Sequence, residues 1–271
     1  MRRSKHSISL VNPTSTTQVL DCHGTNVGAM GSVVITGGSR GIGASVALRC
    51  AEQGWDVAID YVTRTYAATE VVDRCRDLGV QAVAVQGDVA DHNHVRTLFD
   101  AAEAFGPLGG LVNNAGVVGQ MGTLAEATTE RLARIVEINV FGALLCAREA
   151  MRRLTDQGGA IVNVSSAASR LGSAFEFVDY AATKGAMDTM TIGLAGEGGP
   201  HGIRVNAVRP GLVHTDIHAS GGEPGRVERL APNIPLKRGG TADEVAATIV
   251  WLLSDDASYV SGALLDVSGG R

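Results

Sequence analysis

The chain has 271 residues, of which 45% are hydrophobic, 19% are charged and 35 are glycines. This length and composition are typical of a soluble globule with many tight turns, either one large α/β domain or two small ones. The formal net charge of −5 gives no basic footprint for nucleic acid or an anionic membrane, and no apolar run reaches the length of a membrane span. The four scattered cysteines predict reduced thiols and a cytoplasmic protein.

Residues 1–30 differ from the rest of the chain. They are rich in Ser, Thr, Asn and Val and show no hydrophobic period. We expect a disordered N-terminal extension, or a working start at Met30. Three basic residues open the segment and no acid precedes Asp21, so an organelle transit peptide is the alternative. No apolar stretch follows the basic residues, which argues against a secretory signal.

From Ser32 onward, short apolar strands alternate with helical segments. This alternation predicts a parallel sheet covered by helices on both faces. No linker rich in Pro or Ser interrupts residues 31–271, so we expect one doubly wound α/β domain with seven parallel strands. The expected strands contain residues 33–35, 57–59, 82–85, 111–112, 161–164, 205–208 and 264–267.

Three glycines, Gly37, Gly41 and Gly43, lie between the first strand and a helix expected from about Gly41 to Gln53. Glycines at this point permit a tight turn and a close approach of the backbone to a pyrophosphate, which the helix N-terminus binds. The spacing is Gly-x-x-x-Gly-x-Gly, not the commoner Gly-x-Gly-x-x-Gly. Glycine-rich turns without ligands are frequent, but the strand–loop–helix context favours a dinucleotide site.

The end of the second strand bears on the choice between NAD and NADP. An acid there bonds the ribose 2′-hydroxyl of NAD, whereas arginines favour the 2′-phosphate of NADP. Asp60 is a candidate acid, but it lies inside the strand, where its side chain can face away from the ligand. Arg40 and Arg64 are placed to meet a phosphate, with a solvated helix start as the alternative for Arg64. We expect NADP, with NAD as the alternative.

Tyr180 and Lys184 lie one helical turn apart and on the same face. A free tyrosine has a pKa near 10 and is a poor acid–base group at neutral pH. A nearby ammonium favours the phenolate and lowers that pKa. Such pairs also arise by chance, so the pair alone is weak evidence for an acid–base site. The glycine loop upstream strengthens that evidence.

His92 and His94 flank Asn93 in a polar stretch. We expect a solvated turn that opens a helix. A metal site is the alternative, but no further cluster of ligands lies nearby in the sequence. The sequence therefore predicts no metal.

Several motifs together resemble the short-chain dehydrogenase/reductase family, and its sugar and 3-oxoacyl-carrier-protein reductase-like members in particular. The likeness covers Ser32 to the C-terminus and implies a Rossmann fold. It further implies an NAD(P)-dependent oxidoreductase that interconverts a carbonyl and a secondary alcohol of a small molecule by hydride transfer. The motifs are Thr36–Gly43, Asp88-Val89, Asn113–Gly116, Asn139, Ser166, Tyr180 with Lys184, and Arg209–Gly211.

The resemblance implies a catalytic set of four residues. Tyr180 would be the acid–base and Lys184 would hold the nicotinamide ribose and lower the tyrosine pKa. Ser166 would hydrogen-bond the developing oxyanion, and Asn139 would hold a water linked to Lys184. The spacing from Ser166 to Tyr180 is one residue longer than expected, which makes Ser165 a competing assignment. We prefer Ser166, because Ser165 continues the alternation of the strand on the wrong face.

The resemblance also implies a set of cofactor-binding residues. The NAD-selecting acid of the family would fall on Tyr61, one past Asp60, which supports NADP. Asp88 and Val89 would touch the adenine, Asn114 the adenosine side, and Val213 and Thr215 the carboxamide. The full set is Gly37, Ser39, Arg40, Gly41, Ile42, Gly43, Tyr61, Arg64, Asp88, Val89, Asn114, Ala115, Gly116, Tyr180, Lys184, Pro210, Gly211, Val213 and Thr215.

The substrate pocket and the assembly are less sharply defined. We expect residues 167–178 and 214–235 to build the pocket, including Phe175, Phe177, His214, Ile217 and His218. The second segment is glycine-rich and suits a lid, although its aromatic residues suit a contact with a neighbouring subunit equally well. Small residues after Tyr180 and the C-terminal stretch from Ser261 predict a homotetramer, with a dimer as the fallback.

The alternative function is a sensor that binds NADP without turnover. The presence of Ser166, Tyr180 and Lys184 together argues against it.

Overall fold

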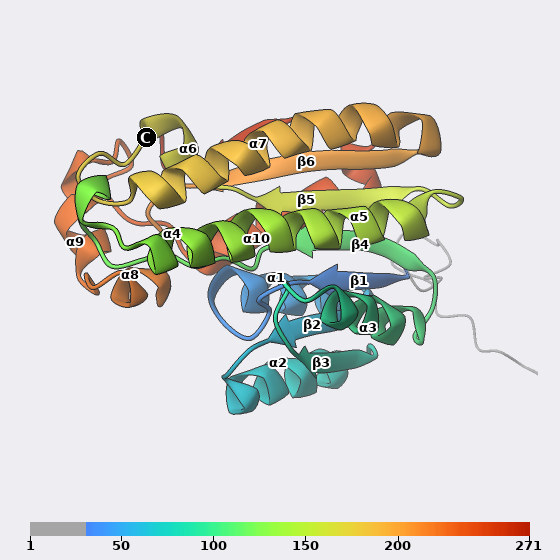
Figure 1. Cartoon of the computed structure of the whole chain (residues 1–271). Helices are drawn as coiled ribbons and strands as arrows, with labels where there is room; N and C mark the ends of the chain where they lie inside the picture. The colour runs from blue at the N-terminus through green and yellow to red at the C-terminus, as the bar shows by residue number, and fades with distance from the viewer. Residues whose placement is uncertain (1–30) are drawn as a thin grey trace, which may run out of the picture.

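The computed structural model describes residues 31–271 (Figure 1). The extension predicted over residues 1–30, with Cys22, lies outside the described residues. The strands are β1 (Ser32–Ile35), β2 (Asp56–Tyr61), β3 (Ala82–Gln86), β4 (Leu108–Asn113), β5 (Gly159–Val164), β6 (Ile203–Pro210) and β7 (Leu264–Val267).

Ten α-helices alternate with these strands. A π-helical turn, Glu137–Gly142, joins the fourth helix to the fifth. None of the helices within residues 31–271 is both long enough and apolar enough to cross a membrane. The helices are α1 (Gly41–Glu52), α2 (Thr65–Asp77), α3 (His92–Glu103), α4 (Thr129–Val136), α5 (Ala143–Leu154), α6 (Ala168–Leu171), α7 (Val178–Gly198), α8 (Ile217–Ser220), α9 (Arg226–Leu230) and α10 (Ala242–Leu253).

All seven strands pair in parallel in the order β3-β2-β1-β4-β5-β6-β7. This arrangement confirms the predicted doubly wound sheet. The chain runs outward from β1 to β3 in one direction and returns through β4 to build the sheet in the other. The crevice at the carboxyl ends of β1 and β4 is therefore the point at which folds of this kind bind ligands.

Helices cover both faces of the sheet (Figure 1). The helices α1, α2 and α10 pack on one face around a core that includes Val46, Val71 and Ile249. The helices α3, α5 and α7 pack on the other face, where the core includes Phe99 and Cys146. Burial on both faces explains why the central strands read as continuous apolar runs.

The strand β4 begins three residues earlier than its apolar run at Leu111 predicts. Gly109 and Gly110 weaken the strand signal in the sequence. In the structure, Ser32 pairs with Leu108 and Val33 with Gly110, so the register skips Gly109. A Cβ on Gly110 would lie 3.0 Å from the carbonyl oxygen of Ala160 on β5. The glycines thus mark an irregular pairing and a close approach of neighbouring strands.

Candidate active site

The loop that follows β1 is fastened to the loop that follows β4. The Thr36 hydroxyl accepts hydrogen bonds from the backbone N–H groups of Asn114 and Ala115, both at 2.9 Å. In return, Asn114 Nδ2 donates to the carbonyl oxygens of Thr36 at 2.8 Å and Gly37 at 3.2 Å. These reciprocal bonds fix the floor of the crevice between the two halves of the sheet.

The glycines of this loop are required by its geometry. Gly37 and Gly41 have φ angles of +65° and +55°, in the left-handed region that favours glycine. A Cβ on Gly43 would overlap the carbonyl oxygen of Gly37 and lie 2.6 Å from Asn114 Nδ2. Gly43 therefore packs beneath the loop and lets the first turn of α1 approach it closely.

Asp60 also holds this loop. Its carboxylate accepts a hydrogen bond from the backbone N–H of Gly37 and lies 3.3 Å from His94 Nε2. Both side chains are buried. The Asp60 carboxylate is therefore bound to the backbone of the glycine loop. It lies near the end of β2, where an acid would select NAD.

The position of His94 corrects one prediction. His92 opens α3 and is exposed, as expected of a solvated turn, but His94 turns inward against Asp60. The two residues lie in the first turn of one helix, where a separation of two residues places them on different faces. The polar neighbours of His94 in the sequence concealed its burial.

Most of the predicted cofactor-binding residues line a single cavity of about 410 Å³. Gly43 lies behind the wall of this cavity, and so does Asn139 of the catalytic set. The cavity also presents the N-terminus of α1, which carries neither a capping side chain nor an acid in its first turn. Its first N–H groups are therefore free for an anion, and together with the glycine cradle they fit a dinucleotide pyrophosphate.

The predicted adenine-side pair is placed at the cavity in two different ways. Val89 is buried, while the Asp88 carboxylate forms an ion pair with Arg134. That pairing holds the pKa of Asp88 below its usual value, despite the opposing effect of burial. Asp88 is therefore a carboxylate fixed at the cavity edge.

Arg40 and Arg64 lie at the rim of the cavity, about half exposed. Both face Asp216, whose Oδ2 lies 3.5 Å from Arg40 Nη1 and 3.0 Å from Arg64 Nη1. Tyr61 lines the same part of the cavity. The structure brings the two arginines to the same acid, and nothing in the sequence indicates that an acid lies between them.

Asn139 lies in the π-helical turn between α4 and α5 and is fully buried. Its Oδ1 accepts from the N–H of Val117 at 2.8 Å. Its Nδ2 donates to the Val117 carbonyl at 2.9 Å and to Thr183 Oγ1 at 3.1 Å. The side-chain amide thus fastens the loop after β4 to α7, the helix that carries Tyr180. Single π-helical turns are frequent at functional sites.

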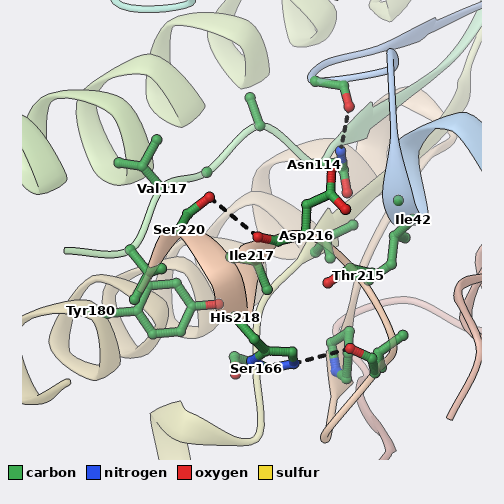
Figure 2. A pocket seen from close by; sticks show the side chains of 18 of the residues that line it. Ile42, Asn114, Val117, Ser166, Tyr180, Thr215, Asp216, Ile217, His218 and Ser220 are labelled. Carbon is green, nitrogen blue, oxygen red and sulfur yellow. Dashed lines mark hydrogen bonds between the residues drawn. The ribbon is translucent and has the colours of Figure 1, made fainter. Parts of the chain in front are cut away.

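Tyr180 and Ser166 line the cavity together with His218 (Figure 2). Burial raises the pKa of the Tyr180 phenol, and a hydrogen bond with the Ser166 side chain acts in the opposite direction. Burial also lowers the pKa of His218, so this imidazole is neutral at pH 7. Tyr180, Ser166 and His218 thus form a group of hydroxyls and an imidazole that can hold and deliver a proton at the phenol.

Lys184 is buried below the tyrosine. Its Nζ donates a hydrogen bond to the Val164 carbonyl at 2.7 Å and lies 5.6 Å from the centre of the Tyr180 ring. Burial lowers the pKa of Lys184 to about 8, against the attraction of the Asp188 carboxylate. The predicted lowering of the tyrosine pKa by Lys184 is therefore not found. The ammonium lies over the ring and bonds to β5, so it does not offset the effect of burial on the phenol.

The two candidate serines face different ways. Ser165 is buried, and its Oγ donates to the Lys184 backbone carbonyl at 3.1 Å. Ser166 lines the cavity, and its Oγ accepts from the Ala168 N–H at 3.1 Å. The pleat of the strand thus directs Ser165 to α7 and leaves Ser166 beside the phenol.

The segment from residue 214 to 233, which contains α8 and α9, closes one side of the cavity. We refer to it as the closing segment. Its buried Arg226 forms ion pairs with Glu176 at 2.5 Å and Glu223 at 3.2 Å, and stacks 5.1 Å from the centre of the Phe177 ring. Nothing in the sequence singles out Arg226, because a charged residue between Gly225 and Val227 is typical of a solvated turn.

The substrate side contains some of the predicted residues and not others. Phe177, Ile217 and His218 line the cavity as expected. Phe175 is 82% exposed, at a φ of +65°, and His214 faces Glu228 at 3.6 Å, so neither belongs to the lining. Their positions in a tight turn and in an exposed loop direct them outward.

Comparisons with known proteins agree with this geometry. A family model described as enoyl-(acyl carrier protein) reductase matches residues 37–271. An uncharacterized oxidoreductase of Escherichia coli, YgfF, is 51% identical over 89% of this chain and 100% of its own length. A 3-oxoacyl-acyl-carrier-protein reductase of Staphylococcus aureus is 34% identical over 88% of this chain and 97% of its own.

A solved structure shares the fold as a whole. It is a short-chain dehydrogenase from Burkholderia cenocepacia in complex with NADP, with a TM-score of 0.83 and 35% identity. The match covers 89% of this chain and 97% of that one. The protein is accordingly an oxidoreductase of the short-chain dehydrogenase/reductase family.

Proposed function

We propose that the protein is an NADP-preferring enzyme that interconverts a carbonyl and a secondary alcohol, with Tyr180 as the acid–base. The observation that carries this proposal is that Tyr180 and Ser166 line the same cavity as the glycine loop. A bound nicotinamide cofactor would supply or accept the hydride. The residues of the chain would orient the substrate and move the proton.

In the direction of reduction, the Tyr180 phenol gives its proton to the carbonyl oxygen of the substrate. Ser166 Oγ–H donates a hydrogen bond to the same oxygen, where charge develops. Because burial raises the pKa of Tyr180, the phenol stays protonated at neutral pH, which favours reduction. Lys184 lies within reach of ribose hydroxyls that enter the cavity, and Asn139 keeps the loop after β4 in place against α7.

Replacement of Tyr180 by Phe tests the mechanism. We expect kcat to fall by at least about two orders of magnitude, the range typical of losing a general acid–base group, while NADPH still binds. Initial rates with NADPH and a panel of ketones, aldoses, 3-oxoacyl thioesters and 2-enoyl thioesters would measure it. Tyr259→Phe is the matched control, because Tyr259 is fully exposed and does not line the cavity.

A Tyr180→Phe enzyme that retains most of its activity would show that another group moves the proton. If the unmodified protein binds NADPH but reduces nothing in the panel, the result would favour a sensor that binds NADP without turnover over an enzyme.

The preference for NADP rests on Arg40 and Arg64 at the rim and on the absence of a free acid at the end of β2, since Asp60 is bound by the glycine loop. The Burkholderia cenocepacia relative was solved with NADP. An arginine pair suits the 2′-phosphate because charge-assisted hydrogen bonds are the stronger kind.

The double replacement Arg40→Ala with Arg64→Ala should weaken NADPH binding at least tenfold more than NADH binding. Each lost hydrogen bond to a charged group corresponds to roughly 1.5–3 kcal/mol. Fluorescence titration of both cofactors would give the dissociation constants. Arg49→Ala is the control, since Arg49 pairs with Asp243 away from the cavity. Equal weakening of both cofactors would argue against 2′-phosphate recognition.

The cradle itself can be tested with one methyl group. Gly43→Ala should weaken NADPH and NADH alike, because the added Cβ pushes on the Gly37 carbonyl and on Asn114 Nδ2. Gly199→Ala is the matched control, since a Cβ there meets no atom within 4 Å and its φ is −52°. Cofactor dissociation constants and the melting temperature of both variants would be compared. Unchanged binding in Gly43→Ala would contradict the assignment of the cradle.

The assembly that we propose is a homotetramer. Ala182, Ala186 and Gly193 form an exposed face of small residues on α7. Phe141 in the π-helical turn and Leu144 in α5 expose about half of their side chains. A partner helix could approach such a face closely. Ala181, another small residue of this helix, is buried within its own subunit.

Sedimentation velocity at micromolar protein should show one boundary for four chains of 28.0 kDa. Ala186→Glu should break the assembly, because a charge would enter the packed face. A monomer boundary for the unmodified chain would rule out both the tetramer and the dimer.

A further inference from the structure

Asp216 bridges the two arginines at the cavity rim. Within residues 31–271, it is the only carboxylate that lies within 4.0 Å of either guanidinium. A single oxygen, Oδ2, faces both Arg40 Nη1 and Arg64 Nη1. Arg40 precedes α1 and Arg64 precedes α2, so this one atom connects the closing segment with two separate loops of the cofactor site.

Local structure does not account for the direction of this carboxylate. Asp216 is the N-cap residue of α8, where an aspartate usually accepts a hydrogen bond from the first N–H groups of the helix. The Asp216 side chain makes no such bond. The Ser220 hydroxyl bonds to the backbone carbonyl of Asp216, at 3.2 Å, and leaves the carboxylate free. The carboxylate is therefore held by the arginines alone.

Resting on the proposed preference for NADP, we propose that Asp216 is a specificity-determining residue. Its carboxylate occupies the guanidinium groups that the 2′-phosphate needs, and it leaves them when that phosphate binds. A phosphate monoester carries a charge of about −1.5 to −2 and three acceptor oxygens, so it displaces a single carboxylate from two arginines. The 2′-hydroxyl of NAD is neutral and gains nothing from the released arginines.

The neighbouring residue extends this exchange to the closing segment. Thr215 Cγ2 lies 3.3 Å from the point where a Cβ would sit on Gly41. Thr215 and Asp216 therefore both lie against the glycine loop, at Gly41 and Arg40. When Asp216 leaves the arginines, the start of the closing segment loses one of its two contacts with this loop. Occupation of the 2′-phosphate position is thereby coupled to the part of the chain that covers the pyrophosphate cradle.

The test is Asp216→Asn in the full chain, which keeps the size of the side chain and removes its charge. The dissociation constant for NADPH should fall about three- to tenfold, the range that corresponds to two exposed ion pairs that no longer compete with the phosphate. The dissociation constant for NADH should change by less than about twofold. Titration with 2′,5′-ADP and 5′-AMP should show the same contrast without the nicotinamide. Asp243→Asn is the control, because Asp243 pairs with an exposed arginine elsewhere.

A double-mutant cycle isolates the mechanism. In the Arg40→Ala, Arg64→Ala background, Asp216→Asn should leave the NADPH dissociation constant unchanged, because the carboxylate then has nothing to release. Circular dichroism melting would verify that each variant is folded.

Three outcomes would overturn the proposal: equal changes for NADPH and NADH, weaker NADH binding through a lost bond to the 2′-hydroxyl, or no change for either. An unmodified chain that binds neither cofactor would overturn the proposed function too. Binding of NADPH by the unmodified chain with no shift in Asp216→Asn would overturn this proposal alone.

Discussion

The site depends on the reciprocal hydrogen bonds between Thr36 and Asn114. They join the carboxyl ends of β1 and β4, the two strands at which the sheet changes direction. Three further features hold the same turn: the Asp60 carboxylate on the N–H of Gly37, the missing side chain of Gly43, and the start of α1. The hydrogen bonds of Thr36, Asn114 and Asp60 each give a backbone polar group a partner, so these bonds set the cradle within the fold without a ligand.

The cavity differs in electrostatic character between its two ends. Lys184 is 3% exposed and bonds to a strand carbonyl, so the charge near Tyr180 acts where little water screens it. Arg40 and Arg64 are about half exposed, where ion pairs contribute little and salt screens them further. The dry end suits proton transfer, and the wet end suits the exchange of one anion for another.

Short-range patterns in the sequence predicted the sheet and its covering helices, and the resemblance to the family implied most of the cavity lining. The period of the apolar runs gave the strands, and the glycine spacing gave the loop. The side chains it missed are polar ones that find partners far away in the chain. His94 reaches Asp60 and Asp216 reaches Arg64, across 34 and 152 residues. Nothing local distinguishes such a residue from a solvated one.

The pKa of Tyr180 shows a different limit. A lysine one helical turn away predicts a lowered phenol pKa only if the ammonium approaches the hydroxyl. The carbonyl of Val164 instead draws the Lys184 ammonium toward β5, and burial then decides the direction of the shift. The spacing gives the face of the helix, whereas the hydrogen-bond partner at the end of a long side chain comes from another element.

The closing segment has one strong and one weak contact with the rest of the chain, and this difference determines which end can move. Arg226 is buried, stacks on Phe177 and pairs with two carboxylates, so moving it away from both would leave an uncompensated buried charge. Asp216 is half exposed and rests on two exposed arginines, so losing those pairs costs little. The segment is therefore anchored beside the substrate side of the cavity and releasable at the cofactor rim. A cofactor that takes the arginines can displace the rim contact without disturbing the wall next to Tyr180.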